Sequence, residues 1–394
     1  MGVKIALTGN HAIAYAVKMA KADFIAAYPI TPQTPIVEKL AEFVETGELK
    51  AKMVRVESEH SALAACFGAA IAGARAFTAT SSQGLLYMHE WVHWVSRVRV
   101  PLVMAVVSRT INAPWNIWPD HSDFVDQRDA GWVMAYAMDS QEAFDLTLQA
   151  FKISEDPAVY LPVMVGIEGF IIGHTAMPVE MPDENLVEQW IGERAQPYIV
   201  DGSDVLGIGS LAFPEDTEDM FYGIQEAMEN AKQVIKRVDE EYGKISGRRY
   251  GGLASCYKCE DAKYITISMG AWSGDLIEGI YKLRDEGYPV GALRIRFYRP
   301  FPIEDVWNEI RNARGVIVFD RSVSFGAWGQ IYTDLVAGLS MYTRNLPYIV
   351  DVVAGIAGVN VTANDFYDIT KSFIDAIESG ELRRNVFVWK RIRR

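Results

Sequence analysis

Short apolar segments of strand length recur along this chain, and most are followed by a longer stretch with helical patterning. In the first half, the apolar segments lie at 24–28, 53–57, 77–81, 102–107 and 159–167, and the helical stretches between them lie at 58–74, 85–96 and 141–154. A strand that is apolar on both faces has to be buried on both faces, which is typical of a parallel sheet covered by helices. The alternation therefore predicts an α/β fold.

The alternation stops in the middle of the chain and then starts again. Residues 177–262 contain a stretch with several prolines, a long charged helix expected at 216–242 and a basic, glycine-rich segment at 244–260. Beyond them, strands are expected at 264–270, 291–297, 316–320 and 348–353, with helices at 276–286, 303–311 and 364–379. Because 394 residues suit two domains of roughly 150 residues each, we predict a parallel-sheet domain over 1–176, a connector over 177–262 and a second, smaller α/β domain over 263–394.

The net charge, the cysteine content and the length of the apolar runs indicate which partners and which compartment to expect. The chain has 38 Lys and Arg against 51 Asp and Glu, a net charge of −13, and such a surface repels the phosphates of nucleic acids. Three cysteines are too few for a disulfide-stabilised scaffold and are typical of a reducing compartment. No apolar run approaches the roughly 18 residues that a membrane span needs. We therefore expect a cytoplasmic protein that binds neither nucleic acid nor membrane.

Four loops that follow predicted strands carry side chains suited to binding or catalysis. In open α/β sheets, ligands bind beyond the carboxyl ends of the strands. The side chains offer a hydroxyl, a carboxylate, an amide and a guanidinium, and they belong to Thr31, Glu59, Gln83 and Arg109. Thr31 also suits the cap of a helix that begins at Pro32, and Glu59 suits a capping carboxylate. Arg109 is less easily explained as a structural residue because an unpaired charge beside an apolar strand is costly.

Two short motifs suggest other chemistry. His89, Glu90 and His93 match the H-E-x-x-H pattern of zinc hydrolases. No third ligand follows at the usual spacing, so the sequence favours a pair of histidines on a helix face over a zinc site. Cys256 and Cys259 form a single C-x-x-C. Structural zinc sites and iron–sulfur clusters need further ligands, so a plain loop pair is one interpretation and a zinc or thiol–disulfide role is the other.

An ordered series of motifs resembles one known family over nearly the whole chain. It comprises Tyr-Pro-Ile-Thr-Pro-Gln-Thr-Pro at 28–35, Glu-Ser-Glu-His-Ser-Ala at 57–62, Phe-Thr-Ala-Thr-Ser-Ser-Gln-Gly-Leu at 77–85, Asp-His-Ser-Asp at 120–123, Arg-Pro-Phe-Pro at 299–302, Asp-Arg-Ser-Val-Ser-Phe-Gly at 320–326 and Gly-Ile-Ala-Gly at 355–358. Each motif alone is weak, but the ordered set is specific. The series closely resembles the alpha subunit of the pyruvate and 2-oxoacid:ferredoxin oxidoreductases.

The resemblance implies a fold and a reaction. The first domain would be the pyrimidine-binding domain of a thiamine-diphosphate enzyme, and the second would resemble the C-terminal domain of transketolase. The reaction would be oxidative decarboxylation, in which a 2-oxoacid and coenzyme A give an acyl-CoA, carbon dioxide and reduced ferredoxin. A zinc hydrolase that uses His89, Glu90 and His93, or a non-catalytic subunit of the same fold, remains an alternative.

The resemblance also implies roles for individual residues. Glu59 matches the catalytic glutamate that hydrogen-bonds the aminopyrimidine ring of the cofactor. Thr31 matches a threonine near the substrate carbonyl, and Arg109 matches the arginine that pairs with the substrate carboxylate, where a planar guanidinium suits a planar anion. The implied cofactor-binding residues further include Tyr28, Pro29 and Gln83. Because Glu59, Thr31 and Arg109 occur together, the sequence argues against a non-catalytic subunit.

Two segments depart from the pattern of the pyruvate enzymes. The stretch 168–174 resembles a substrate-pocket segment, but Ile171 and Ile172 stand where more polar residues are common, and the stretch 112–119 differs as well. Both departures would allow a branched or aromatic side chain on the substrate. The 2-oxoacid therefore stays open among pyruvate, branched-chain and other acids.

Parts of the implied active site are missing from the sequence. The Gly-Asp-Gly motif that holds Mg²⁺ beside the diphosphate is absent, since Gly274-Asp275-Leu276 fails at its third position, and no ferredoxin-type cysteine run exists. The resemblance therefore implies a beta-type subunit that carries the diphosphate site, Mg²⁺ and a [4Fe-4S] cluster. It further implies a gamma-type subunit, a ferredoxin-like delta-type subunit with more clusters, and ferredoxin as electron acceptor. Apart from the open question of Cys256 and Cys259, no metal ligand is expected on this chain itself.

Overall fold

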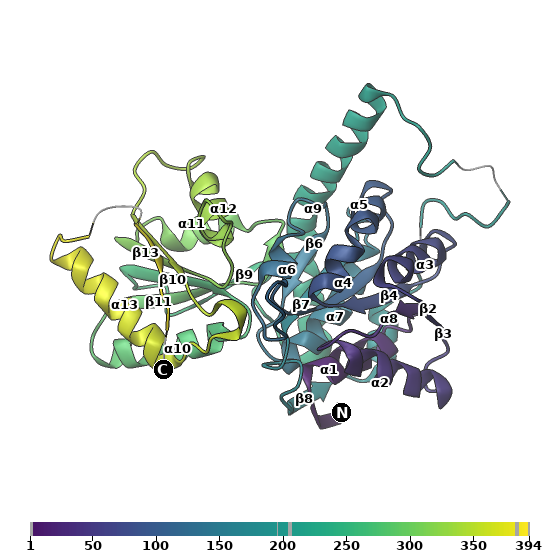
Figure 1. The fold of residues 1–394 in the computed structure, drawn as a ribbon, viewed down its shortest axis with the longest axis horizontal. Helices are drawn as coiled ribbons and strands as arrows, with labels where there is room; N and C mark the ends of the chain where they lie inside the picture. Colours follow the sequence, from purple (N-terminus) through teal and green to yellow (C-terminus); the bar gives the residue numbers. More distant parts are fainter. Residues whose placement is uncertain (1–2, 195, 204–206, 383–385, 393–394) are drawn as a thin grey trace.

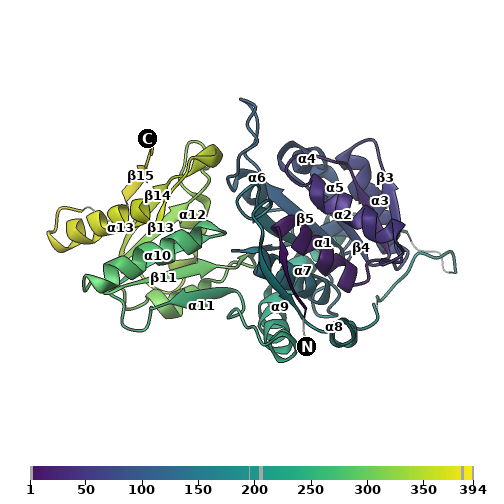
Figure 2. The same cartoon turned by 90° about the horizontal axis from the view of Figure 1, so that it is seen from below.

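Two α/β units lie side by side in a computed structural model of the chain, which describes residues 3–194, 196–203, 207–382 and 386–392 (Figure 1). The first unit is built on a seven-stranded sheet and the second on a six-stranded sheet, and a small two-stranded sheet accompanies the first. The view from below shows the same division (Figure 2). The predicted α/β class is confirmed.

The seven-stranded sheet has the order β12-β6-β7-β5-β4-β2-β3. Its strands are β2 (Phe24–Ala27), β3 (Lys52–Arg55), β4 (Ala76–Thr80), β5 (Val103–Ser108), β6 (Val133–Tyr136), β7 (Val163–Glu168) and β12 (Phe297–Arg299). Every pairing in it is parallel except that of β12 with β6. The parallel pairing follows from the helices between the strands, because such a crossover returns each strand in the same direction.

Helices cover both faces of this sheet. One face packs against α1 (Gly9–Met19), α2 (Thr34–Glu45) and α7 (Ser140–Ser154), and the other against α3 (Glu59–Ile71), α4 (Ser82–Tyr87), α5 (His89–Arg97) and α6 (Ser122–Val125). Strand β5 illustrates why residues 103–107 are all apolar. Val103, Ala105 and Val107 lie in the core of the first face, whereas Met104 and Val106 lie in that of the second.

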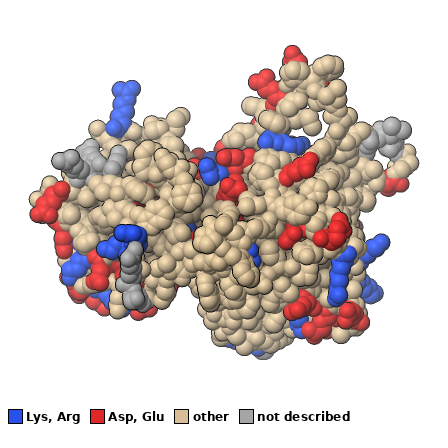
Figure 3. All heavy atoms as spheres, viewed as in Figure 1, with Lys and Arg blue, Asp and Glu red and all other residues tan. Residues whose placement is uncertain are grey.

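A long helix and a small sheet follow the first unit. Strand β1 (Val3–Leu7) pairs antiparallel with β8 (Met177–Met181), and α8 (Glu184–Ile191) follows. Helix α9 (Pro214–Ser246) packs on α7 and extends beyond the body of the molecule (Figure 1). Acidic side chains, including Glu215 and Asp216 of its first turn, gather at its outer end (Figure 3). None of the helices in the described part of the chain has the length and hydropathy needed to cross a bilayer.

The six-stranded sheet has the order β15-β14-β13-β10-β11-β9. Its strands are β9 (Ala254–Tyr257), β10 (Tyr264–Met269), β11 (Val290–Ile295), β13 (Gly315–Asp320), β14 (Tyr348–Val353) and β15 (Val386–Trp389). Only β9 runs antiparallel to its neighbour. The helices of this unit are α10 (Trp272–Asp285), α11 (Ile303–Ile310), α12 (Gln330–Leu339), the short η1 (Ile356–Gly358) and α13 (Ala363–Glu378).

The two units share a core and a strand. β12 belongs to the first sheet although it follows β11 of the second sheet directly, and the Tyr136 N–H donates to the Arg296 carbonyl oxygen at 2.8 Å. One cluster of buried side chains runs from Met104 and Phe124 in the first unit to Ile267 and Ile295 in the second. The relative position of the units is therefore held by packing. The predicted domain limits at 176 and 262 remain a prediction.

Several predicted elements differ from the structure. The stretch 85–96, expected as one helix, consists of α4 and α5, which meet at Met88. The segment 177–204 contains β8 and α8, and the expected loop 244–260 contains the end of α9 and the edge strand β9. A short edge strand such as β9 is set by pairing with its neighbour, and that pairing leaves little trace in local periodicity.

Candidate active site at the ends of three strands

The loops after β2, β4 and β5 bring three of the predicted residues together. Arg109 Nη1 donates to the Thr31 carbonyl oxygen at 2.8 Å, and Arg109 Nη2 donates to Gln83 Oε1 at 2.5 Å. The Arg109 side chain is held deep between these loops, with only 5% of the residue exposed. Burial lowers the pKa of its guanidinium, and the nearby carboxylates of Asp123 and Glu59 oppose that change. A guanidinium has five N–H donors, so this arrangement leaves donors for a ligand.

Asp123, a residue that the sequence analysis did not single out, holds two of these loops in place. Its carboxylate accepts the backbone N–H of Ser82 at 2.8 Å and that of Arg109 at 3.0 Å. Burial raises the pKa of the Asp123 carboxyl to about 7, although these backbone donors act in the opposite direction. Its place in the Asp-His-Ser-Asp motif is the sequence signal that points to it, but its bonding partners lie 41 and 14 residues away.

Glu59 is the first residue of α3, and its carboxylate is unengaged, which here means without a hydrogen-bond or ion-pair partner among the described residues. The cap of α3 is Ser58, whose side chain accepts the Ser61 N–H, so Glu59 is not needed for that bond. Only 7% of Glu59 is exposed, and within the described ranges its carboxylate has no hydrogen-bond or ion-pair partner. A buried acid without a partner is unusual, and it suits a site that a ligand completes.

A glycine makes room for the Glu59 side chain. A Cβ atom at position 84 would lie 2.7 Å from Glu59 Oε1 and 2.5 Å from Thr80 Oγ1. Real Cβ atoms are not found at such distances, so any larger residue at this position would displace the carboxylate. Gly84 therefore brings the first turn of α4 against Glu59.

The loop after β2 exposes the other predicted residues. Thr31 is exposed and is not the helix cap that the sequence suggested, because α2 begins at Thr34 with Gln33 at its N-cap. Tyr28 and Pro29 also face solvent. The buried Gln33 amide, which the sequence analysis missed, fixes this loop by donating to the Ala79 carbonyl oxygen at 2.6 Å.

Two buried donors in this group have no partner among the residues described. They are Gln83 Nε2 and Arg109 Nε. Buried polar groups are nearly always hydrogen-bonded in native proteins. Because these donors lie beside the exposed Thr31 loop and the unengaged Glu59, they fit a ligand that offers carbonyl or carboxylate oxygens.

Aromatic side chains lie next to this polar group. The Trp118 ring is 5.0 Å from that of Phe170, which stacks on His174 at 4.8 Å. The Thr110 N–H donates to the Trp118 carbonyl oxygen, so the backbone of this tryptophan lies beside that of the Arg109 loop. The two isoleucines of the predicted pocket segment separate, since Ile171 is 41% exposed and Ile172 belongs to the first core.

A buried ionic group joins the two units behind the site. His121 Nε2 lies 3.0 Å from Glu168 Oε1, and the same oxygen accepts the Ala271 N–H at 2.9 Å. Arg321 Nη1 is 3.8 Å from it. The Glu168 side chain, which begins the predicted pocket segment, thus points to the junction and binds atoms of both units.

The histidine motif does not form a metal centre. His89 Nδ1 contacts Gln127 Oε1 at 2.6 Å, and the Nε2 atoms of His89 and His93 lie 3.2 Å apart. Glu90 pairs with His60. In the described part of the chain, the one group of three or more His, Cys, Asp or Glu residues close enough to hold a metal ion is a different one, at Cys256, Cys259 and Glu309. The zinc-hydrolase alternative has no support.

Comparisons with known proteins agree over nearly the whole chain. The family described as "Pyruvate flavodoxin/ferredoxin oxidoreductase, thiamine diP-bdg" matches residues 15–240, and "Pyruvate:ferredoxin oxidoreductase core domain II" matches residues 262–366. The pyruvate synthase subunit PorA of Pyrococcus furiosus is 43% identical over 98% of this chain and 97% of its own length. The ketoisovalerate oxidoreductase subunit VorA of Pyrococcus horikoshii is 40% identical over 100% of this chain and 99% of its own length.

Solved structures show the same fold at low identity. The 2-oxoglutarate:ferredoxin oxidoreductase from Magnetococcus marinus, with 2-oxoglutarate, coenzyme A and succinyl-CoA bound, has a TM-score of 0.72 at 20% identity over 94% of this chain, which spans 65% of the length of that one. A split-gene transketolase has a TM-score of 0.56 at 12% identity over 93% of this chain and 98% of its own. The predicted pairing of a thiamine-diphosphate-binding domain with a transketolase-like second domain is confirmed. The chain belongs to the family of alpha subunits of the pyruvate and 2-oxoacid:ferredoxin oxidoreductases.

Proposed function

We propose that this chain supplies the pyrimidine-side half of a thiamine-diphosphate site and the substrate-carboxylate site of a 2-oxoacid:ferredoxin oxidoreductase. The complex converts a 2-oxoacid and coenzyme A into an acyl-CoA and carbon dioxide, and two electrons pass to ferredoxin. The observation that carries the proposal is the unengaged Glu59 carboxylate, which lies against Gly84 and near the Arg109 charge. Arg109 in turn binds Gln83 and the Thr31 carbonyl oxygen. A carboxylate, an amide and a guanidinium gathered at these strand ends are typical of a ligand site in an α/β sheet.

The residues present fit the pyrimidine ring of the cofactor. Glu59 is buried and lacks a partner, so it is free to share a proton with a ring nitrogen, and Gln83 Nε2 is an unpaired donor nearby. When bound, thiamine diphosphate supplies a nucleophilic carbon for the 2-oxoacid carbonyl and accepts the electron pair released by decarboxylation. Glu59 holds the proton that tunes this ring, and the exposed Tyr28 and Pro29 form the neighbouring rim.

The other half of the site belongs to partner subunits. The 394 residues contain neither a complete Gly-Asp-Gly motif for Mg²⁺ nor a ferredoxin cysteine run, and Mg²⁺ needs several oxygen ligands beside the phosphates. A beta-type subunit therefore carries the diphosphate, Mg²⁺ and a [4Fe-4S] cluster. A gamma-type and a ferredoxin-like delta-type subunit complete the route for electrons, and ferredoxin accepts them.

The substrate is a 2-oxoacid with a branched or aromatic side chain. Trp118 is 52% exposed and Ile171 is 41% exposed, next to the Arg109 loop. Burying a large apolar substrate side chain against this surface contributes about 1.5–3 kcal/mol to the binding free energy. The methyl group of pyruvate would bury much less of the surface. Assaying the native complex with a panel of 2-oxoacids, coenzyme A and ferredoxin tests both the reaction and the substrate class.

We expect Trp118→Ala to lower kcat/KM for the preferred 2-oxoacid roughly 10- to 100-fold, because a lost burial of about 1.5–3 kcal/mol corresponds to that factor. The value for pyruvate should change little. Trp115→Ala is the matched control, since Trp115 is 81% exposed in the same loop. An equal fall for pyruvate and for branched or aromatic 2-oxoacids would contradict the proposed side-chain contact.

Arg109→Lys is expected to raise the KM for the 2-oxoacid roughly 10- to 100-fold with a smaller change in kcat. A charged hydrogen bond contributes about 1.5–3 kcal/mol, and an ammonium cannot reproduce the two-pronged contact of a guanidinium. Steady-state kinetics of the complex measure it, with Arg55→Lys on the exposed face of β3 as control. A KM that stays at the wild-type value would show that Arg109 does not bind the substrate carboxylate.

A further inference from the structure

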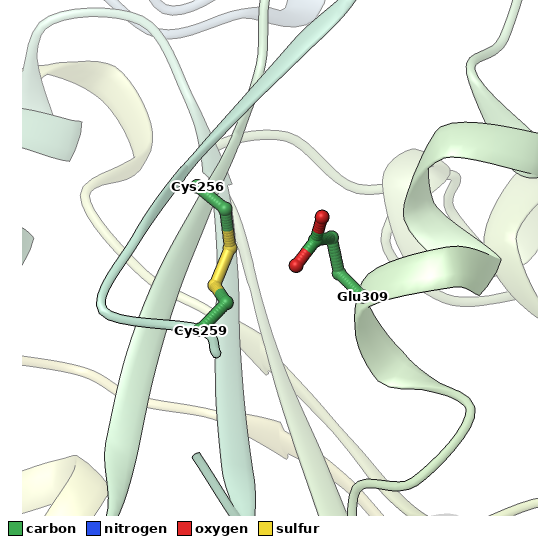
Figure 4. A group of neighbouring side chains, drawn as sticks. All are labelled: Cys256, Cys259 and Glu309. Atoms are coloured by element: carbon green, nitrogen blue, oxygen red, sulfur yellow. A yellow bond between two sulfur atoms is a disulfide. The ribbon is translucent and has the colours of Figure 1, made fainter. Parts of the chain in front are cut away.

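The C-x-x-C pair lies outside the proposed active site, on the edge of the second sheet. Cys256 is on the edge strand β9, Cys259 follows the next turn, and Glu309 reaches them from α11 (Figure 4). The two sulfur atoms and a carboxylate oxygen of Glu309 all lie within 4.8 Å of one another. The two cysteines form a disulfide in this structure, toward which the Glu309 carboxylate points.

The turn between the two cysteines is sharp and is held by contacts with α10 and β11. Lys258 has a φ of 55°, which lies in the left-handed region and turns the chain sharply between the two cysteines. Arg284 Nη2 donates to the Lys258 carbonyl oxygen at 2.6 Å and so fixes the turn from α10. Gly291 on β11 lets the turn approach closely, since a Cβ there would lie 2.7 Å from the Lys258 carbonyl oxygen.

These three side chains match the ligands of a zinc ion. Two cysteines in C-x₂-C spacing are the usual chelating pair of structural zinc sites, and carboxylate oxygens also bind zinc. Zinc binds sulfur at about 2.3 Å and carboxylate oxygen at about 2.0–2.2 Å. Once the disulfide is reduced and the two sulfurs separate, the three donor groups are close enough to reach one ion.

Room for a fourth ligand lies beside the pair. A cavity of about 170 Å³ is lined by Cys256 and Glu309 together with Ser255, Asp305 and Asn308. Asp305 is already paired with Lys236 at 2.6 Å, which leaves a water molecule as the simplest fourth ligand. Tetrahedral coordination by two sulfurs and two oxygens is then complete.

We propose that, when the two cysteines are reduced, Cys256, Cys259 and Glu309 bind one Zn²⁺ ion, with water as the fourth ligand. A dithiol reductant converts the disulfide to two thiols and is itself oxidised to a disulfide. Both thiols then release their protons as the zinc–sulfur bonds form. Zinc and the disulfide are mutually exclusive states of this pair, and zinc ties the edge strand β9 to α11.

The test uses the purified full-length chain, reduced with a phosphine and stripped with a chelator. Zinc is then titrated in competition with a chromophoric chelator, and bound metal is measured by mass spectrometry. We expect one zinc per chain in the wild type, none in Cys256→Ser or Cys259→Ser, and at least tenfold weaker binding in Glu309→Gln. Glu260→Gln, an exposed acid beside Cys259, is the matched control and should bind as the wild type does.

A second measurement avoids substitutions altogether. Wild-type protein oxidised with diamide should bind no zinc, and re-reduction should restore one zinc per chain and raise the melting temperature when zinc is added. Absence of stoichiometric zinc in the reduced wild type would overturn the proposal and leave a thiol–disulfide pair. Zinc that persists in the oxidised chain, or that binds equally well in Glu309→Gln, would overturn the ligand assignment.

Discussion

Glu59→Ala in the assembled complex is expected to lower kcat roughly 10²–10⁴-fold, the usual effect of removing a group that holds or transfers a catalytic proton. The carboxylate is buried and has no partner among the residues described, so its loss should leave the fold and the assembly intact. Steady-state assays with ferredoxin measure the activity, and size-exclusion chromatography measures the assembly.

Two further variants sharpen this test. Glu59→Gln keeps the size of the side chain but cannot carry the acidic proton, so it should be nearly as inactive as the alanine variant. Glu57→Ala is the matched control, because Glu57 is an exposed acid two residues away that bonds Ser61, and it should retain normal activity. Wild-type rates in Glu59→Gln would refute a catalytic role for the carboxylate.

Glu142→Gln is expected to lower the free energy of unfolding by roughly 3–5 kcal/mol, the usual cost of removing one partner from a buried ionic group. Glu142 lies in the first turn of α7, where its carboxylate binds both Arg294 and Arg296 from the second unit. Arg296 Nε is 2.6 Å from Glu142 Oε1, and both side chains are buried. The substitution would leave the Arg294 guanidinium without its counter-ion, and Arg296 would keep only Asp239, whose Oδ1 lies 3.8 Å from Arg296 Nη1.

The same residue gives the stability a pH dependence with a definite sign. Burial alone would raise the pKa of the Glu142 carboxyl, but the two arginines outweigh it and lower this pKa to about 2. A folded-state pKa below the unfolded value means that the stabilisation is present above about pH 4.5 and is lost as the pH falls toward 2. The wild type should therefore lose stability over this window more steeply than Glu142→Gln does.

Urea unfolding followed by circular dichroism at several pH values measures both effects. Because a two-unit chain can unfold in more than one transition, tryptophan fluorescence is recorded as a second probe. Glu229→Gln is the control, an exposed acid paired with Lys232, and it should change the free energy of unfolding by less than about 1 kcal/mol. Equal stabilities for Glu142→Gln and the wild type would show that the arginines are held by other groups.

The part of the fold that could be predicted from the sequence is the part with a local signal. The apolar run at 102–107 predicts a strand buried on both faces, and β5 (Val103–Ser108) is one. The long charged helix expected at 216–242 is α9, which is longer by a few residues at each end. By contrast, β12 could not be assigned to the first sheet, because its pairing with β6 depends on how the two units dock.

The candidate site also contains residues that the sequence pattern predicted and residues that it did not. Thr31, Gln83 and Arg109 were placed at strand ends by the sequence pattern, and the structure puts their atoms within hydrogen-bonding distance. Their roles in catalysis remain predictions. Asp123, which fixes two of these loops, and Glu168, which joins the two units, were not recognised as such. Each acts on backbone N–H groups from distant segments, and those contacts leave no periodic trace.

The amino-acid sequence by itself determined the α/β class, the family and the residue types at the strand ends, because burial on two faces and loop chemistry are properties of short segments. Only the tertiary structure decided which buried charges are neutralised, which loops share a hydrogen bond and how Cys256, Cys259 and Glu309 come together. Those outcomes depend on pairs of atoms that are distant in the chain, and a burial cost can be offset only where the fold brings the partner into contact.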